Sequence, residues 1–355
     1  MTIPPPQSRV ASLPGSALRH RLLNLPNLLA LIIALSLVYF LVARFDFDLS
    51  DTWDRVGENS FIWYALAFVV YYLIFPLRGL RWRFLLEGAG CDLGADNNRI
   101  STVRLTELSF LGWFVNTITI FRMGFVYRCH LLSRQLKSSF ALVAGSLFAE
   151  RILDTVITSA LLLVAGLWLL SSGAAPFVAP ALLGALVVSL VLAGPAIAMA
   201  LAGINPGRIL PPRLRHGYGN FRQGTVMSFR RWPWLVALSL AIWACESARL
   251  FLVVQALGLS VELPLIVFVA LAASLIASFP ITPGGLGLVE AGMTGLLTTS
   301  LPWEEAVQVA LLDRSINYLS VVALGIALIL VRNLPGLASR TRTPTIGATQ
   351  EHSLE

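Results

Sequence analysis

Charged side chains interrupt long apolar runs at several points of this sequence, and these residues have the clearest capacity for chemistry. They are Glu150, Arg151, Asp154, Glu246, Arg249, Glu290, Asp313 and Arg314. At about 2.5 kcal/mol for each charge at bilayer depth, these charges left unpaired would together exceed the roughly 5–15 kcal/mol by which folded proteins are stable. We therefore predict that they are paired or hydrated, and an arginine among them has a planar guanidinium group that could grip a phosphate.

Local spacing suggests partners for some of these charges. Glu246 and Arg249 are three residues apart, so on a helix they would neutralise each other and have a structural role. Glu150 and Asp154 are four residues apart and share a helix face, from which Arg151 is turned away. For Arg151 and Arg314 two interpretations stay open, namely that they bind a phosphate or that they lock two halves of the protein together.

A second unusual feature is SFPITPGGLGLVEAG, residues 278–292, whose prolines and glycines interrupt an apolar run. Broken backbone at membrane depth survives only when it is buried in protein or lines a wet cavity. The segment predicts either a tight loop between two spans or an anion site, in which backbone N–H groups from Gly284 to Gly287 face the ligand at a helix N-terminus. Glu290, in the first turn of that helix, would compete with an anion and favours a proton or cation role.

Composition places these residues in a membrane. The chain is 56% hydrophobic and 13% charged, with a mean hydropathy of +0.76, as is typical of polytopic membrane proteins. Residues 1–20 and 333–355 are predicted to be flexible cytoplasmic tails, far shorter than the roughly 50 residues of a domain. The three cysteines follow no metal or disulfide spacing, so we predict no metal and no cofactor. The net charge of +7 favours cytoplasmic loops and anionic headgroups over nucleic acid.

Apolar runs of about 20 residues predict the membrane-spanning helices. These are residues 22–44, 61–80, 138–170, 176–202, 232–257 and 306–332. Two further regions, 105–121 and 264–301, are predicted to enter and leave by the same side as re-entrant hairpins. With the N-terminus inside, 21 basic residues then fall on the cytoplasmic side, against Arg44 and Arg55 outside. This predicts a multi-pass plasma (inner) membrane protein with both termini cytoplasmic.

The two halves of the chain resemble each other. RWRFLLEGAG (81–90) resembles RLFLVVQALG (249–258), and ERILD (150–154) resembles DRSIN (313–317). Gly124 precedes Arg151 by 27 residues, and Gly287 precedes Arg314 by the same 27. Each half would hold three spans and one hairpin, an odd number of crossings, so the second half must be inverted.

We therefore predict an all-α polytopic fold over residues 21–332, built from two inverted repeats, 22–170 and 176–332. In such architectures the substrate site lies near the midplane, where broken segments meet.

Residues 60–332 resemble the transmembrane domain of lysylphosphatidylglycerol synthases and their stand-alone, flippase-like relatives. The resemblance is carried by RGLRWRFLL, FRMGFVYRCHLLSR, FAERILD, FPITPGGLGLVEAG and LLDRSINYL. In the full synthases this domain moves aminoacylated lipid between leaflets, and a separate cytosolic domain makes that lipid. The resemblance implies that this chain corresponds to the translocating half only.

By position, the resemblance implies a set of substrate-binding residues. They are Arg122, Gly124, Arg128, Glu150, Arg151, Asp154, Pro283, Gly284, Gly285, Gly287, Glu290, Asp313 and Arg314. The chain departs from the family pattern at Ile120, where proline is usual, and at Phe125, where an acid is usual.

The leading functional prediction is a transporter that moves a phosphate-bearing lipid, either a phospholipid or an isoprenoid-linked lipid, between leaflets. Its partners would be membrane lipids with an anionic or phosphate-bearing headgroup. The alternatives are an integral-membrane lipid-modifying enzyme, for which no catalytic constellation is apparent, and an accessory assembly protein of a lipid or hopanoid pathway. Small-residue faces such as AGMTG are compatible with protein contacts, including a homo-oligomer.

Overall fold

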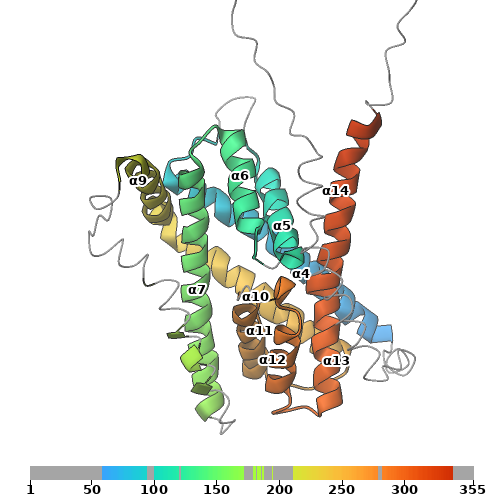
Figure 1. Cartoon of the computed structure of the whole chain (residues 1–355). Coiled ribbons are helices and arrows are strands. Elements are labelled where there is room, and N and C mark those ends of the chain that lie inside the picture. The colour runs from blue at the N-terminus through green and yellow to red at the C-terminus, as the bar shows by residue number, and fades with distance from the viewer. Residues whose placement is uncertain are drawn as a thin grey trace, which may run out of the picture.

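The structure is a computed structural model of the whole chain. It describes residues 58–93, 100–119, 121–171, 211–278 and 282–338, with short parts of 179–194. Within these ranges every regular element is a helix, which confirms the all-α membrane fold (Figure 1). The predicted span 22–44 lies outside the described residues, and 176–202 lies largely outside them.

Four helical segments among the described residues are long and apolar enough to cross a bilayer. They are Ser60–Ala89, Phe140–Ser171, Arg215–Ala256 and Trp303–Ile329. Each corresponds to one of the predicted spans, because hydropathy over about 20 residues is a strong signal.

These segments are formed by several helices. They are α4 (Glu58–Ala89), α7 (Phe140–Ser171), α9 (Pro212–Val226) with η2 (Met227–Arg231) and α10 (Trp232–Ala256), and α13 (Trp303–Arg314) with the π-turn η4 (Ser315–Leu319) and α14 (Ser320–Ala338). Helix α14 continues to Ala338, past residue 333, where the predicted C-terminal tail begins. Pro335 marked that boundary in the sequence, yet the helical backbone continues past it.

Helix α4 runs antiparallel to the segment formed by η2 and α10, and the two cross the centre of the molecule side by side (Figure 1). Arg81 Nη1 donates to Ser239 Oγ at 2.7 Å, and Ser228 Oγ donates to the carbonyl oxygen of Leu85 at 3.0 Å. Trp82, also on α4, is completely buried. This tight pairing gives the other helices a rigid surface on which to pack.

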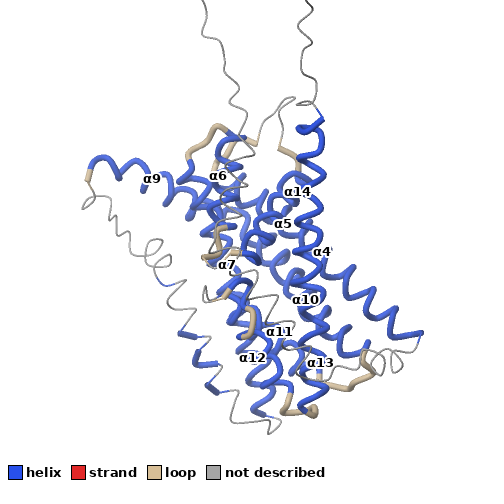
Figure 2. The backbone as a smooth tube through the Cα atoms, turned by 45° about the vertical axis from the view of Figure 1, so that its right-hand side comes forward, coloured by secondary structure: helices blue, strands red, loops and turns tan. Residues whose placement is uncertain are grey.

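Two helix pairs are each interrupted by irregular backbone. The first broken pair is α5 (Thr102–Ile118) with α6 (Gly124–Leu136), and the second is α11 (Leu263–Ser278) with α12 (Leu288–Leu297). The second break contains the short helix η3 (Pro283–Gly285). The two pairs lie toward opposite ends of the molecule in both views (Figures 1 and 2).

The two breaks meet in the interior. Helix α5 packs against η3, and the Arg122 guanidinium in the first break donates to the carbonyl oxygen of Ala277 at the end of α11. Arg122 from the first break and Gly284 from the second line the same cavity, and broken backbone is tolerated at membrane depth where it lines a cavity.

Candidate functional site: a central cavity rich in arginine

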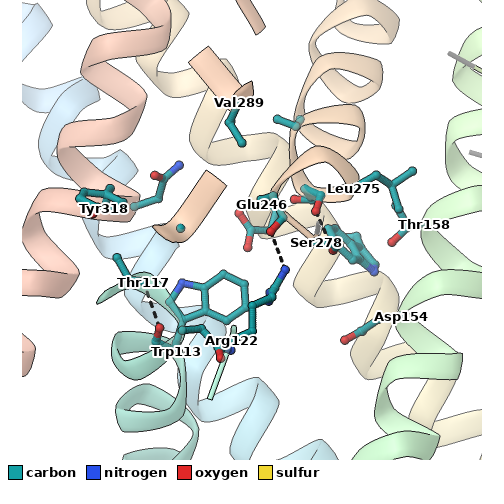
Figure 3. A pocket seen from close by; sticks show the side chains of 18 of the residues that line it. Trp113, Thr117, Arg122, Asp154, Thr158, Glu246, Leu275, Ser278, Val289 and Tyr318 are labelled. Atoms are coloured by element: carbon teal, nitrogen blue, oxygen red, sulfur yellow. Dashed lines mark hydrogen bonds between the residues drawn. The ribbon is translucent and has the colours of Figure 1, made fainter. Parts of the chain in front are cut away.

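A cavity of about 360 Å³ lies where the two broken pairs meet the long helices. Figure 3 shows Trp113, Arg122, Glu246 and Tyr318 around it, contributed by different parts of the chain. Its volume is at the lower end of the roughly 300–1,000 Å³ of small-molecule pockets. Such a space can hold a lipid headgroup, but it cannot hold acyl chains that fill half of a hydrocarbon core about 30 Å thick.

Arg81 is the centre of the first group of ion pairs. Its guanidinium binds both carboxylate oxygens of Asp154, at 2.5 and 3.0 Å, and one oxygen of Glu150 at 3.2 Å. Arg128 binds the other oxygen of Glu150 at 3.0 Å, and its guanidinium lies 4.1 Å from the centre of the Trp82 ring. Because α4 continues to Ala89, Arg81 lies in the interior and not in the cytoplasmic loop where the sequence pattern placed it.

Arg249 is the centre of the second group. It pairs with Asp313 and, at 3.2 Å, with Glu246, so the predicted neutralisation of Glu246 by Arg249 is confirmed. Glu246 forms a second ion pair with Arg78, in which Nη2 of Arg78 lies 3.7 Å from Oε1 of Glu246. The guanidinium of Arg78 lies over the Trp113 ring, 4.5 Å from its centre.

The two groups follow the predicted repeat. Arg81 and Glu150 form a pair in the first half. The residues aligned with them in the second half, Arg249 and Asp313, form a pair as well. These equivalent contacts support the inverted repeat, which otherwise stays a prediction.

The Pro-Gly-Gly loop is held by Arg314 and Glu290. Arg314 binds Glu290 at 2.7 Å and the carbonyl oxygen of Gly284 at 2.9 Å. Glu290 also accepts the backbone N–H of Gly287 at 2.7 Å. The acid therefore has an ion-pair and helix-capping role in this structure, and a proton role stays a prediction.

The backbone N–H groups of this loop are largely used within the loop. Gly285 donates to the carbonyl oxygen of Thr282, and Leu286 donates to that of Pro283. Together with Gly287, which donates to Glu290, three of the four N–H groups from 284 to 287 have internal partners. Three of these donors are thus already engaged in this structure, and an anion site built from the N–H groups of the loop stays a prediction.

The glycines are nevertheless required by the backbone. Gly284, Gly285 and Gly287 have φ of 59°, 75° and 81°, values that side chains other than glycine rarely adopt. A Cβ atom on Gly284 would lie 2.6 Å from Cε2 of Tyr318 and 3.3 Å from the carbonyl oxygen of Thr117. The backbone of the loop therefore packs directly against the Tyr318 ring in η4 and against the backbone of α5, and a side chain on Gly284 would not fit.

The first break has its own conformational signature. Arg122 has φ of 48°. A positive φ is uncommon in residues other than glycine, and residues with such strained backbone cluster at functional sites. The next helix begins at Gly124, whose N–H donates to the Asn116 side-chain oxygen at 2.9 Å. The break is thus held in a conformation that brings the Arg122 guanidinium to the cavity and to Ala277.

Arginines outnumber carboxylates around the cavity. We define the central charge network as the charged residues that line the cavity or belong to the ion pairs connected with it, within the described part of the chain. It contains seven arginines, Arg78, Arg81, Arg122, Arg128, Arg151, Arg249 and Arg314, and five carboxylates, Glu150, Asp154, Glu246, Glu290 and Asp313. The network therefore carries two more positive than negative charges.

Arg122 and Arg151 account for this excess. Both line the cavity, and neither forms an ion pair with a carboxylate of the described residues. Arg314, which is aligned with Arg151 in the predicted repeat, is paired with Glu290. The second half thus neutralises its arginine, whereas the first half leaves the equivalent one facing the cavity.

The structure separates the predicted substrate-binding residues into two groups. Those that line the cavity are Arg122, Arg151, Asp154, Gly284, Asp313 and Arg314. Those that pack or pair behind it are Gly124, Arg128, Glu150, Pro283, Gly285, Gly287 and Glu290. Substrate binding by the first group stays a prediction. The residues of the second group form the hydrogen bonds, ion pairs and packing contacts behind the cavity lining.

Sequence reasoning did not identify several lining residues. Trp243, on α10, and Tyr318, in η4, both line the cavity, and the indole N–H and the phenol hydroxyl are buried without a hydrogen-bond partner among the described residues. Their spacing resembles that of ordinary apolar helix residues, so no local signal distinguished them. Phe125, where an acid is usual in the family, also lines the cavity.

Comparison with known proteins agrees with these features. The family described as "Lysylphosphatidylglycerol synthase TM region" matches residues 27–325. A UPF0104 membrane protein of Methanocaldococcus jannaschii is 27% identical over 215 residues, which are 60% of this chain and 91% of that protein. One from Methanothermobacter thermautotrophicus is 25% identical over 302 residues, covering 78% and 87% of the two chains. No solved structure matches. The family description fits a lipid-related role for a multi-pass membrane protein.

Proposed function

Since the chain belongs to the family of lysylphosphatidylglycerol synthase TM regions, we propose that it moves a lipid with a phosphate-bearing headgroup between the leaflets of its membrane. The observation that carries this proposal is the excess of two arginines, Arg122 and Arg151, at the central cavity. The headgroup enters the cavity, and the acyl chains stay in the surrounding lipid.

Electrostatics gives the reason why an anion belongs there. A charge removed from water is costly unless an opposite charge compensates it, and ion pairs already compensate the other arginines of the network. A phosphate group offers the missing negative charge, and it matches the planar fork of a guanidinium in a bidentate geometry. Binding of a phosphate-bearing headgroup therefore lowers the free-energy cost of removing the two arginines and the headgroup from water.

The meeting of the two breaks supports a mechanism of alternating access. The hydrogen bond from Arg122 to Ala277 joins the first broken pair to the second directly beside the cavity. An anion that binds Nη1 of the Arg122 guanidinium competes with that carbonyl for the N–H groups of this nitrogen. Headgroup binding thus favours separation of the two pairs, which is the movement that would open the cavity to one side.

We also propose that the protein lies in the inner membrane with both termini cytoplasmic. Arg78, Arg81, Arg122 and Arg128 were counted as cytoplasmic from the sequence, but they belong to the central charge network. Without these four, the cytoplasmic side still has 17 basic residues against two outside. The positive-inside rule therefore supports the same orientation.

The lipid-modifying enzyme is less well supported. The carboxylates that line the cavity, Asp154, Glu246 and Asp313, are all held by arginines. Each of these carboxylates is therefore engaged in an ion pair, an arrangement that suits binding better than acid–base catalysis.

The decisive experiment is leaflet-resolved lipid movement in proteoliposomes. Phosphatidylglycerol with a fluorescent acyl chain is reconstituted with the purified protein, and a membrane-impermeant quencher reports the fraction in the outer leaflet over time. We expect the wild-type protein to accelerate movement and Arg151→Gln to lose that activity.

The matched control is Arg104→Gln, which removes a partly exposed arginine whose partner is Glu107, outside the cavity. This variant should move the lipid normally. Equal activity of the Arg151→Gln protein and the wild type would refute the proposal.

A further inference from the structure

One amide side chain joins two ion pairs in the second half of the chain. Asn317, in η4, donates from Nδ2 to Oδ2 of Asp313 at 2.7 Å, and its Oδ1 accepts from Nη1 of Arg314 at 3.3 Å. Asp313 is paired with Arg249 on α10, and Arg314 is paired with Glu290 on α12. An amide has donors on its nitrogen and an acceptor oxygen, so it matches a carboxylate on one side and a guanidinium on the other.

Arg314 extends this connection to the second break. Its three guanidinium nitrogens donate to three different elements, namely Nε to Glu290 of α12 at 2.7 Å, Nη2 to the carbonyl oxygen of Gly284 in η3 at 2.9 Å, and Nη1 to Asn317 of η4. The donors of a guanidinium have a fixed planar geometry, so a displacement of one acceptor strains the bonds to the other two. The orientation of Arg314 therefore determines how firmly the Pro-Gly-Gly loop is held.

The backbone of Asn317 is fixed by α4. Three tyrosine hydroxyls of α4 hydrogen-bond to the π-turn, those of Tyr64 and Tyr72 to the hydroxyls of Ser315 and Ser320, both at 2.6 Å, and that of Tyr71 to the carbonyl oxygen of Asn317 at 3.3 Å. Single π-turns within α-helices are rare and frequently occur at functional sites. The amide of Asn317 thus projects from a fixed support between Asp313 and Arg314.

We propose that the Asn317 amide couples the pair of Arg249 and Asp313 to the Pro-Gly-Gly loop, so that the second break opens when this pair separates. Arg249, Asp313 and Gly284 all line the cavity. A buried carboxylate that loses its cation attracts other cations, and Asn317 holds Arg314 beside Asp313. An anion in the cavity that draws Arg249 away from Asp313 therefore shifts Arg314 and releases the carbonyl oxygen of Gly284. This inference rests on the proposed headgroup site and describes how occupation of that site reaches the second break.

Modification of a thiol in the second break measures its opening directly. Thr282→Cys places a thiol just before Pro283, where the threonine hydroxyl is buried, so the thiol reacts chiefly when the loop opens. The full chain in detergent is treated with methyl methanethiosulfonate, and peptide mass spectrometry follows each cysteine separately. The native Cys129, which is completely buried in α6, reports any general loss of structure.

Asn317→Leu nearly preserves the size of the side chain but removes both hydrogen bonds of the amide. It should raise the modification rate of the Thr282→Cys thiol about tenfold, the effect of one or two net hydrogen bonds, and leave that of Cys129 unchanged. The matched control is Asn220→Leu, at an exposed amide of α9 beside His216, which should change neither rate. Equal acceleration at both thiols would show that Asn317 only stabilises the fold and would overturn the inference, as would an unchanged rate at the Thr282→Cys thiol.

A double-mutant cycle tests the coupling itself. Asp313→Asn removes the charge of the pair and should also accelerate modification of the Thr282→Cys thiol. Combined with Asn317→Leu it should add little, because the link is already broken. Additive effects of the two substitutions would contradict the inference. If the Asp313→Asn protein does not fold, Tyr71→Phe takes its place in the cycle, because it removes only the hydroxyl that contacts the backbone of Asn317.

The thiol assay involves no lipid movement, so the coupling and the proposed function can fail separately. If Asn317→Leu exposes the Thr282→Cys thiol but the wild-type protein moves no lipid in the quenching assay, the coupling holds and the proposed transport is contradicted. If the wild type moves lipid and Asn317→Leu leaves the thiol protected, this inference alone fails. If no lipid moves and the thiol stays protected, both fail.

Discussion

Substitution of two arginines of the same network by glutamine should have different effects, one on the stability of the fold and the other on phosphate binding. Arg81 is completely buried and binds Asp154 through two hydrogen bonds, Glu150 through one and Ser239 through one. Arg151 is partly buried and has no ion pair with a carboxylate of the described residues. The contrast between them tests whether the charge excess around the cavity is real.

The magnitude follows from what each substitution leaves behind. Arg81→Gln leaves Asp154 without its arginine and Glu150 with Arg128 alone, and an uncompensated buried charge costs about 3–5 kcal/mol. Arg151→Gln removes a positive charge from a network that already has an excess, so we expect little change in the free energy of unfolding. For a chain of this size the first substitution should lower the melting temperature by about 5–15 °C.

The assay is thermal unfolding of both variants in the same detergent, followed by tryptophan fluorescence, together with phosphate binding at low temperature. We expect Arg81→Gln to lose stability, and Arg151→Gln to keep stability but lose phosphate binding. If Arg151→Gln is destabilised as strongly as Arg81→Gln, then Arg151 has a structural partner and the reasoning from charge excess is refuted. Unchanged phosphate affinity in Arg151→Gln would refute it equally.

Further predictions concern the loop, the guanidinium and the topology. Gly285→Val should abolish lipid movement without preventing membrane insertion, because φ is 75° there and the new Cβ would lie 2.7 Å from Cγ2 of Val289. Gly295→Val, where a Cβ meets nothing within 4 Å, is its control in the quenching assay. Arg151→Lys should impair lipid movement and phosphate affinity, because lysine keeps the charge but lacks the planar fork. Gln135→Cys, at an exposed position near the end of α6, should react with an impermeant maleimide from the cytoplasmic side, and labelling from outside would contradict the topology.

Apolar length and local spacing are properties that the sequence alone determined. Four predicted spans that fall in the described ranges coincide with long apolar helices, because the bilayer demands continuous hydrogen-bonded apolar segments wherever the chain crosses it. The pairing of Glu246 with Arg249 was equally predictable, since residues three apart on a helix are neighbours whatever surrounds them. The positive φ at Gly285 is compatible with the local sequence, because glycine has no Cβ atom and adopts positive φ at little steric cost.

The charge balance of the site was decided only by the tertiary structure. Arg81 lies within an arginine cluster that reads as a cytoplasmic loop, and only the packing of α4 against α7 and α10 shows it binding Asp154. Arg151 and Arg314 occupy equivalent places in the sequence, yet Glu290 neutralises only Arg314. No local pattern shows which partner a buried charge will meet across a fold, because that depends on distances between residues far apart in the chain. Those distances give the site its surplus of positive charge, on which the proposed binding of an anion rests.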